Sequence, residues 1–365
     1  MSGTREITLV PGMTDYVHEI PETLERAAVA VPPQAQRIAE RVGRVERIEL
    51  VGSGTSLHGA LAVRTELEAR LGVEVRVRTP SEYLTGPRGR VGAGTLMLAI
   101  SQTGRSTGTI DAMADARGRG AFTVLVTGWP DSSGADAADA VLDIACGPEW
   151  VGARTKGYVA TLYALLVLSD ALSPRVPAGD AAVDVDVAAA ARRVIADADA
   201  AVSAMADALE PAAAVWMVSY GTEMATAREG ALKLLETVRI PIPVFDVEEY
   251  MHGPYHCLEA DTFLIFIAPE GPGRERFESL VRFVADRTRH VVVVESARTV
   301  ADERVLRFPV HAELPPRFGP LLSIVPLQLL SAELTWRRGR EPGVSRYPDF
   351  HDLLASKTAP PPRGR

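Results

Sequence analysis

Short apolar runs rich in β-branched residues alternate with longer stretches of helical character along the first half of the chain. Five of these runs predict β-strands, at residues 47–52, 73–77, 95–100, 122–128 and 140–145. The segments between the runs are long enough for helices, and strands that alternate with helices form parallel sheets. We therefore expect an α/β fold in which a parallel sheet is flanked by helices.

The second half of the chain repeats this scheme. Apolar runs recur at residues 214–221, 241–245, 262–269, 290–296 and 305–310. The repetition indicates a duplication, so two α/β units are expected. An alanine-rich stretch between the halves has apolar residues at helical spacing and predicts a connecting helix.

We expect the chain to divide into five segments. Pro, Gly and Arg become frequent after Arg340, which predicts a tail rather than a core element. The expected segments are a lead segment (1–34), a first unit (35–180), the connecting helix (181–208), a second unit (209–340) and the tail (341–365).

A hydroxyl-rich turn follows the third predicted strand and carries the first indication of a ligand. The segment 98–109 reads LAISQTGRSTGT, so a strand runs into a turn and then into a helix. Gly104 lets the backbone direct N–H groups toward an anion at the helix N-terminus. A second such turn, VGSGTS at 51–56, ends in Ser56, whereas the matching turns of the second half offer fewer hydroxyl groups. We expect one phosphate site, at the carboxyl ends of the strands of the first unit.

Composition limits the classes of partner. The chain has 365 residues, 47% of them hydrophobic, and a net charge of −8, which argues against nucleic acid as a partner. Residues 1–17 lack the apolar core of a signal peptide, and no apolar run reaches the roughly 18 residues of a membrane span. A cytoplasmic protein without a membrane partner is expected. Cys146 and Cys257 are too few and too far apart for a disulfide framework or a zinc cluster.

Several short motifs follow one another in a specific order. They read GSGTS, SEYL, SQTGRST, EWVGARTKGY, REGALKLLE and EEYMHGP, after a lead segment MTDYVHEIPETL at 13–24. In this order they resemble the sugar isomerase (SIS) family, and specifically the isomerase half of glucosamine-6-phosphate synthase. The resemblance covers nearly the whole chain. It implies two tandem SIS subdomains, each a flavodoxin-like parallel sheet flanked by helices.

The resemblance implies which residues of the first unit contact the ligand. The implied phosphate cradle consists of Ser56, Ser101, Gln102, Thr103 and Ser106. The implied sugar-lining residues are Thr55, Ala153 and Thr155. Arg105 and Arg154 stand where the synthase usually has small or acidic residues, and arginine at these places favours a carboxylate or a second anion on the substrate.

The REGALKLLET motif carries the candidate chemistry. Lys233 and Glu236 are three residues apart on a predicted helix, so their side chains lie on one face, and Glu229 lies one turn earlier. A surface salt bridge is the alternative reading of such a pair. By resemblance, Glu236 is the base that moves a proton between C1 and C2 of an opened sugar. Partial shielding from water would raise the pKa of its carboxyl toward the working pH.

Two further groups are implied by the resemblance. His252 in EEYMHGP matches the histidine that opens the sugar ring and that the family supplies across a dimer interface; the alternative is a histidine that caps a turn. Lys357 matches a tail lysine that folds over the sugar, although the longer tail leaves a solvated lysine as the alternative. Gly253 and Pro254 separate His252 from His256, so no helical metal pair, and no metal site, is expected.

These features predict an enzyme. Position 2 is Ser2 rather than the cysteine of a glutaminase, and no glutaminase domain precedes the isomerase motifs, so we expect an amino-sugar 6-phosphate deaminase/isomerase that needs no cofactor. One alternative is a fructosamine-6-phosphate deglycase, which needs a larger pocket for the leaving amine. The other is a non-catalytic sugar-phosphate sensor, which would not need Glu236, His252 and Lys357 together. We expect a homodimer with shared active sites.

Overall fold

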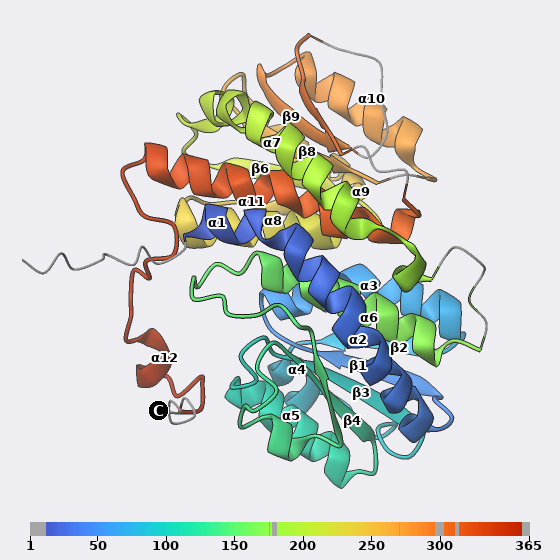
Figure 1. Ribbon diagram of the computed structural model, residues 1–365. Coiled ribbons are helices and arrows are strands. Elements are labelled where there is room, and N and C mark those ends of the chain that lie inside the picture. Colours follow the sequence, from blue (N-terminus) through green and yellow to red (C-terminus); the bar gives the residue numbers. More distant parts are fainter. Residues whose placement is uncertain are drawn as a thin grey trace, which may run out of the picture.

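Two five-stranded parallel sheets form the framework of the molecule (Figure 1). The computed structural model describes residues 12–174, 176, 181–269, 271–295, 303–310 and 314–359. The expectations for the start of the lead segment (1–11) and the end of the tail (360–365) lie outside these residues.

The first sheet contains the strands predicted in the first half. They are β1 (Arg47–Val51), β2 (Glu74–Arg78), β3 (Thr95–Ile100), β4 (Phe122–Thr127) and β5 (Ala140–Asp143), in the order β2-β1-β3-β4-β5 with every pair parallel. All six residues of the central strand β3 are buried, because helices cover both faces of the sheet. Burial on both faces explains why the strands read as continuous apolar runs.

The second sheet repeats this topology. It contains β6 (Val215–Ser219), β7 (Val244–Asp246), β8 (Phe263–Ala268), β9 (His290–Glu295) and β10 (Leu306–Pro309). Its order, β10-β9-β8-β6-β7, is that of the first sheet counted from the other edge, and all its pairs are parallel. Each of the ten predicted runs overlaps an observed strand. The predicted α/β fold of two flanked parallel sheets is confirmed.

The helices follow the same duplication. In the first half α3 (Thr55–Leu71), α4 (Pro80–Thr85), α5 (Thr107–Gly118), η1 (Ala135–Ala137) and α6 (Lys156–Leu172) follow β1 to β5 in turn. In the second half α8 (Glu223–Thr237) follows β6, α9 (Val247–Met251) and η3 (Pro254–Cys257) follow β7, α10 (Arg274–Ala285) follows β8, and η4 (Pro316–Phe318) and α11 (Gly319–Arg337) follow β10. The first half is preceded by α1 (Met13–His18) and α2 (Ile20–Val42), and the second by η2 (Ala182–Asp184) and α7 (Val187–Leu209).

Helices from both halves lie between the two sheets (Figure 1). Helix α3 packs against α8, α2 against α6 and α7, and α7 against α11. Helix α11, together with η4, is long and apolar enough to span a membrane by composition, but 89% of its most apolar window is buried inside the molecule. It is therefore a core helix, and one apolar core continues from the first sheet to the second.

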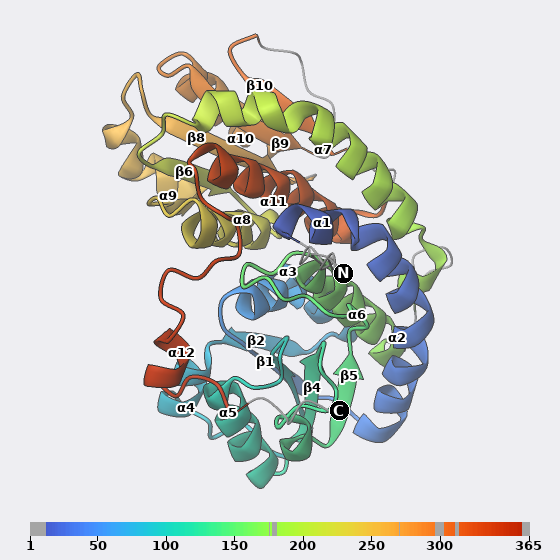
Figure 2. The same cartoon turned by 60° about the vertical axis from the view of Figure 1, so that its left-hand side comes forward.

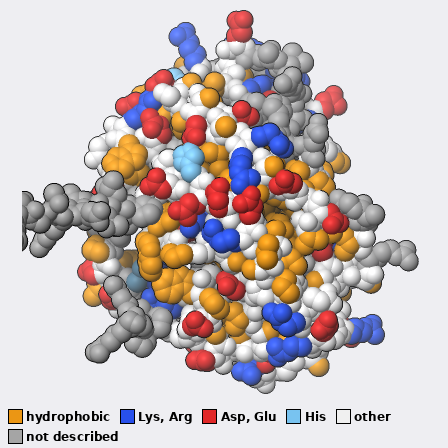
Figure 3. All heavy atoms as spheres, in the orientation of Figure 1, with side chains coloured by type: hydrophobic (Ala, Val, Ile, Leu, Met, Phe, Trp, Pro, Cys, Tyr) orange, Lys and Arg blue, Asp and Glu red, His pale blue; other side chains and the backbone are white. Residues whose placement is uncertain are grey.

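The helices α2 and α7 carry charges of both signs on the outer face seen in Figure 3, where acidic and basic side chains are interspersed. Arg192 of α7 contacts Glu25 of α2 at 2.6 Å, for example. Ion pairs of this exposed kind contribute little to stability, and no continuous basic area covers this face.

The tail returns from the second half to the first. After α11 the chain passes the short helix α12 (Phe350–Leu353) and reaches the turn at residues 101–106 that follows β3, the predicted phosphate turn (Figure 2). There Lys357 forms an isolated antiparallel bridge with Ser106. The amide of Thr107 donates to the carbonyl of Ser356 at 3.3 Å, so the tail is hydrogen-bonded to the first turn of α5.

Candidate active site

The two hydroxyl-rich turns emerge side by side at the carboxyl edge of the first sheet. Val51 at the end of β1 pairs with Ala99 of β3, so the turns that follow begin next to each other. A side chain at Gly52 would place its Cβ 2.9 Å from the Cβ of Ser56 and 3.2 Å from the carbonyl oxygen of Ile100. Only glycine fits this approach, which holds the Ser56 turn against the end of β3.

The turn after β3 has a conformation that requires glycine. The amide of Gly104 donates to the carbonyl of Ser101 at 2.8 Å, and Gly104 has a φ of +60°. A Cβ at this position would lie 1.8 Å from Oγ of Ser132. The tight turn leads to Ser106, the N-cap residue of α5. Hydroxyl groups around the N-terminus of a 12-residue helix favour an anion.

Gln102 is held by a buried carboxylate. Its Nε2 donates to Oε2 of Glu149 at 2.9 Å. The amide and the hydroxyl of Thr155 donate to Oε1 of Glu149 at 2.6 and 2.8 Å, and the amide of Gly157 donates to Oε2 at 3.1 Å. Glu149 thus joins the phosphate turn to the start of α6. Glu149 begins the motif EWVGARTKGY, but the sequence alone predicts no role for it.

The other expected binding residues differ in accessibility. Thr55, Ser56 and Thr103 are half-buried at the edge of the turns. Ala153 is buried in a small apolar cluster that contains Met13 of α1. The first three residues can therefore meet a ligand through their side chains, whereas the methyl group of Ala153 packs against the lead helix.

Three cations gather around the phosphate turn. Lys357 pairs through its backbone with Ser106, Nε of Arg105 donates to the carbonyl of Thr358 at 2.8 Å, and the guanidinium of Arg154 donates to the carbonyl of Glu149. Burial, and then the charges of Arg154 and Arg105, lower the pKa of Lys357. Among the described residues no carboxylate forms an ion pair with any of these three side chains. The turn therefore carries positive charge that no carboxylate in the described part of the chain neutralises through an ion pair.

Helix α8 brings the candidate base next to the first turn. Nζ of Lys233 lies 2.8 Å from Oε2 of Glu236, 3.3 Å from Oε1 of Glu229 and 3.4 Å from Oγ1 of Thr55. The Lys233 and Glu229 side chains are fully buried, whereas that of Glu236 is 37% exposed. Burial alone would lower the pKa of Lys233, but the two carboxylates raise it overall. Glu236 thus faces an ammonium on one side and solvent on the other.

A histidine that sequence analysis did not select belongs to this network. Nδ1 of His58 lies 2.7 Å from Oε2 of Glu229, and Oγ1 of Thr55 donates to Oε1 of the same carboxylate at 2.9 Å. His58 and Thr55 are three residues apart on α3, so they share one face of that helix. The sequence GTSLHG does contain the signal, but the partner is 171 residues away in sequence.

His252 lies apart from these groups. It is exposed at the C-terminal end of α9, and no hydrogen bond or ion pair between described residues joins it to Lys233, Glu236 or the phosphate turn. Gly253, with a φ of +155°, separates it from the 3₁₀-helix that carries His256. Within the described ranges no three His, Cys, Asp or Glu side chains are arranged to hold a metal ion.

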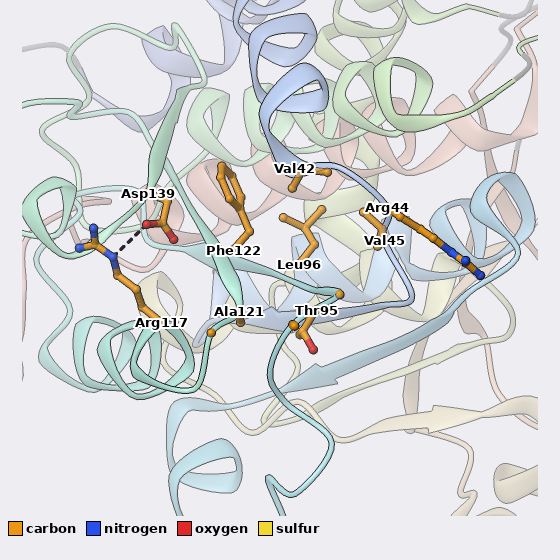
Figure 4. A pocket seen from close by; sticks show the side chains of 12 residues that line it. Val42, Arg44, Val45, Thr95, Leu96, Arg117, Ala121, Phe122 and Asp139 are labelled. Atoms are coloured by element: carbon orange, nitrogen blue, oxygen red, sulfur yellow. Dashed lines mark ion pairs between the residues drawn. The ribbon is translucent and has the colours of Figure 1, made fainter.

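A cavity lies at the opposite edge of the first sheet (Figure 4). Its volume is about 540 Å³, and its walls include Thr95 and Phe122 at the starts of β3 and β4, with the Arg117–Asp139 ion pair at 2.9 Å. None of the expected site residues lines it. In parallel α/β sheets ligands bind at the carboxyl ends of strands, so the turns rather than this cavity form the candidate site.

Comparison with known proteins places the turns in a recognised domain. Residues 44–170 match the family described as the SIS domain. A glutamine–fructose-6-phosphate aminotransferase (isomerizing) of Methanothermobacter thermautotrophicus is 31% identical over 90% of this chain, which spans 55% of the length of that relative.

Solved structures share the fold along almost the whole chain. A structure from Clostridium difficile 630 assigned to the phosphosugar isomerases has a TM-score of 0.85 and 24% identity, and the match covers 96% of this chain and 99% of that one. A glucosamine-6-phosphate deaminase of Thermotoga maritima has a TM-score of 0.74 and 19% identity, with 92% of this chain and 96% of that one covered. At these identities the likeness shows the fold alone.

Proposed function

Because the chain is a SIS-domain protein, homologous to the isomerase domain of glutamine–fructose-6-phosphate aminotransferases, we propose that it isomerises and deaminates an amino-sugar 6-phosphate. The observation that carries this proposal is the contact between the two halves of the site. Thr55, which precedes Ser56 of the phosphate turn, lies within 3.4 Å of the Lys233 ammonium, and Lys233 contacts Glu236 at 2.8 Å. One small molecule can therefore contact both the turn that contains Ser56, through its phosphate, and the Glu236 carboxylate.

The proposed reaction begins with the phosphate on the turns of the first unit. Ser56, Ser101, Thr103 and Ser106 bind it through hydroxyl groups, and the cations beside the turn balance its charge. Gln102 maintains the shape of the turn through Glu149. Binding at this fixed point aligns the sugar chain with Glu236.

Glu236 then moves a proton between two neighbouring carbons. In the open-chain sugar its carboxylate removes the proton from C2 while O1 gains a proton, which gives an enolamine. The carboxyl then returns its proton to C1 while the nitrogen loses one, which gives an imine at C2. Water adds to the imine carbon, and ammonia leaves. The products from glucosamine 6-phosphate are fructose 6-phosphate and ammonia, with one water consumed. Lys233 places its ammonium 2.8 Å from this carboxylate.

We place His252 in the site of a second copy of the chain. Its exposure and its lack of contact with Glu236 favour a partner's site over its own, so the proposed assembly is a homodimer with shared active sites. An inactive Glu236→Gln chain mixed with an inactive His252→Ala chain should then recover part of the activity. Recovery in the mixture supports shared sites, and its absence together with a monomer by light scattering would contradict the dimer.

A second candidate reaction is favoured by the cations at the turn. Arg105, Arg154 and Lys357 together carry more positive charge than a phosphate dianion needs. The additional positive charge favours a substrate whose leaving amine carries a carboxylate, as in a fructosamine 6-phosphate made from an amino acid. Deglycation of such a conjugate uses the same proton transfer and releases the amine in place of ammonia.

One assay separates these reactions. Release of amine and formation of a hexose 6-phosphate are measured for hexosamine 6-phosphates and for fructosamine 6-phosphates of amino acids. Glu236→Gln should lower kcat by about 10²- to 10⁴-fold, the contribution of a general base. Glu275→Gln, an exposed position on α10, is the matched control and should leave kcat unchanged.

The outcomes of this assay are distinct. Turnover of hexosamine phosphates supports the deaminase, and turnover of the conjugates alone supports the deglycase. Thermal stabilisation by these compounds without any turnover would contradict catalysis and favour a sugar-phosphate sensor. Full activity of Glu236→Gln would contradict the role of this carboxylate.

A further inference from the structure

The pair formed by His58 and Glu229 connects the two halves of the molecule at the candidate site. His58 belongs to α3 of the first half and Glu229 to α8 of the second, and their atoms Nδ1 and Oε2 lie 2.7 Å apart. The side chain of Glu229 is fully buried and that of His58 is only 14% exposed. A carboxylate oxygen only accepts, so Nδ1–H of His58 is the donor.

Glu229 divides its two oxygens between different partners. Oε2 accepts from His58, whereas Oε1 accepts from Thr55 at 2.9 Å and faces Nζ of Lys233 at 3.3 Å. Every oxygen of this buried carboxylate is therefore satisfied, as buried charges require. Lys233 remains closer to Glu236, at 2.8 Å, than to Glu229.

Two carboxylates, those of Glu229 and Glu236, share the single ammonium of Lys233. Glu229 and Glu236 are both within contact distance of Lys233, which has no other carboxylate partner among the described residues. A hydrogen bond from His58 stabilises the negative charge on Glu229. This bond weakens the attraction between the Glu229 carboxylate and the Lys233 ammonium. Without that bond the ammonium would move toward the fully buried Glu229, because electrostatic attraction is stronger where water is excluded.

We propose that His58 is a positioning residue that, through Glu229, keeps the Lys233 ammonium on Glu236. This inference rests on the proposed role of Glu236 as the base. His58 does not need to touch the substrate for this purpose. Nε2 of His58 has no hydrogen-bond partner among the described residues. The hydrogen bond from Nδ1 to Glu229 is therefore the polar contact that orients the imidazole.

The first test is a spectroscopic one that needs no substrate. In protein labelled with ¹⁵N-histidine, the resonances of His58 are assigned from their loss in His58→Ala, against the other six histidines of the chain. They should show the Nδ1–H tautomer and should shift in Glu236→Gln, because the two groups are coupled through Lys233. Unchanged His58 resonances in Glu236→Gln would overturn the proposal, even if the substrate is still unknown.

The second test is kinetic. His58→Ala should lower kcat by about tenfold to a hundredfold with little change in KM, as expected when an orienting partner is lost. His58→Asn places an amide donor near the position of Nδ1 and should recover most of the activity. His18→Ala is the matched control, since His18 forms an exposed pair with Asp199 at 2.8 Å between α1 and α7.

The results separate positioning from other roles. Full activity in His58→Ala would overturn the proposal. Equal loss in His58→Ala and His58→Asn, with both variants folded, would show that the imidazole itself transfers a proton. A wild-type chain that turns over no substrate contradicts the proposed function, and the resonance shift then still decides whether the coupling exists.

Discussion

Glu223 occupies the place in the second half that Ser56 occupies in the first. The motifs VGSGTS and VSYGTE follow corresponding strands, and their last residues are Ser56 and Glu223. Glu223 is buried, accepts a hydrogen bond from Oγ of Ser323 at 3.0 Å, and has a second oxygen without a partner among the described residues. Burial raises the pKa of its carboxyl to about 7. In the second half a buried carboxyl side chain therefore occupies the position that the Ser56 hydroxyl occupies in the first half.

This raised pKa predicts a pH-dependent stability. Below pH 4.5 Glu223 is protonated in both the folded and unfolded states, so burial has no electrostatic cost. Between about pH 4.5 and 7 only the unfolded state releases the proton, so the free energy of unfolding falls as pH rises, by on the order of 3 kcal/mol. Glu223→Gln should be more stable than the wild type at pH 8 and equal to it at pH 4. Urea unfolding across this range measures the difference, and parallel curves would contradict it.

Single residues of the site differ in how far the sequence predicts them. The contact between Lys233 and Glu236 follows from their spacing on one helix, and it is present at 2.8 Å. The contacts of Glu229 with Thr55 and His58, and that of Glu149 with Gln102, could not be predicted, because only tertiary packing brings these elements together. Local spacing is readable from one sequence, whereas a contact between α3 and α8 is not.

At the scale of elements, the strands were the most predictable part of the fold. Each strand of a covered parallel sheet is apolar on both faces, so it appears in the sequence as a short apolar run between polar turns. The short helices α4 and α9, of six and five residues, leave no comparable pattern. Their positions depend on the sheets rather than on helix periodicity.

The turn between β3 and α5 should lose its function when Gly104 is replaced. Gly104→Ala combines a left-handed backbone angle with a Cβ only 1.8 Å from Oγ of Ser132. We expect the free energy of unfolding to fall by about 1–3 kcal/mol and phosphosugar affinity to fall at least about tenfold. Calorimetric binding of fructose 6-phosphate and denaturant unfolding measure both effects.

Gly118→Ala is the control for this turn. Gly118 ends the same helix, and a Cβ there would have no atom within 4 Å. Alanine should leave binding unchanged and raise stability by about 0.5–1 kcal/mol, because it restricts the unfolded chain. Equal affinity in both variants would contradict the assignment of the turn as the phosphate site.

At the scale of the whole molecule, the end of the tail lies on the turn that follows β3. The large side chains of α12 remain exposed, with Phe350 at 51%, Leu353 at 74% and Leu354 at 61%. They therefore add little apolar burial to the core. The described contacts of the end of the tail include hydrogen bonds with the turn after β3, such as that from the amide of Thr358 to the carbonyl of Arg105 at 2.9 Å, and one between the hydroxyl groups of Thr358 and Ser133 at 2.7 Å.

Truncation after Gly343 should separate affinity from stability. Removal of Lys357 and its segment should weaken the binding of fructose 6-phosphate by about tenfold to a hundredfold, the value of a lost charge-assisted hydrogen bond. The melting temperature should change by only a few degrees. Lys357→Ala in the full chain distinguishes loss of the charge from loss of the segment. Unchanged affinity in the truncated protein would refute a role of the tail in binding.

The path of the tail also fixes an order of events during synthesis. Lys357 is translated after every strand of both sheets, yet it lies on a turn built from residues near position 106. The ribosome therefore adds the residues of all the described strands to the chain before it adds this cation. The segment that closes over this turn is thus among the last parts of the chain to be synthesised, and its contact with Ser106 can form only after the turn itself exists.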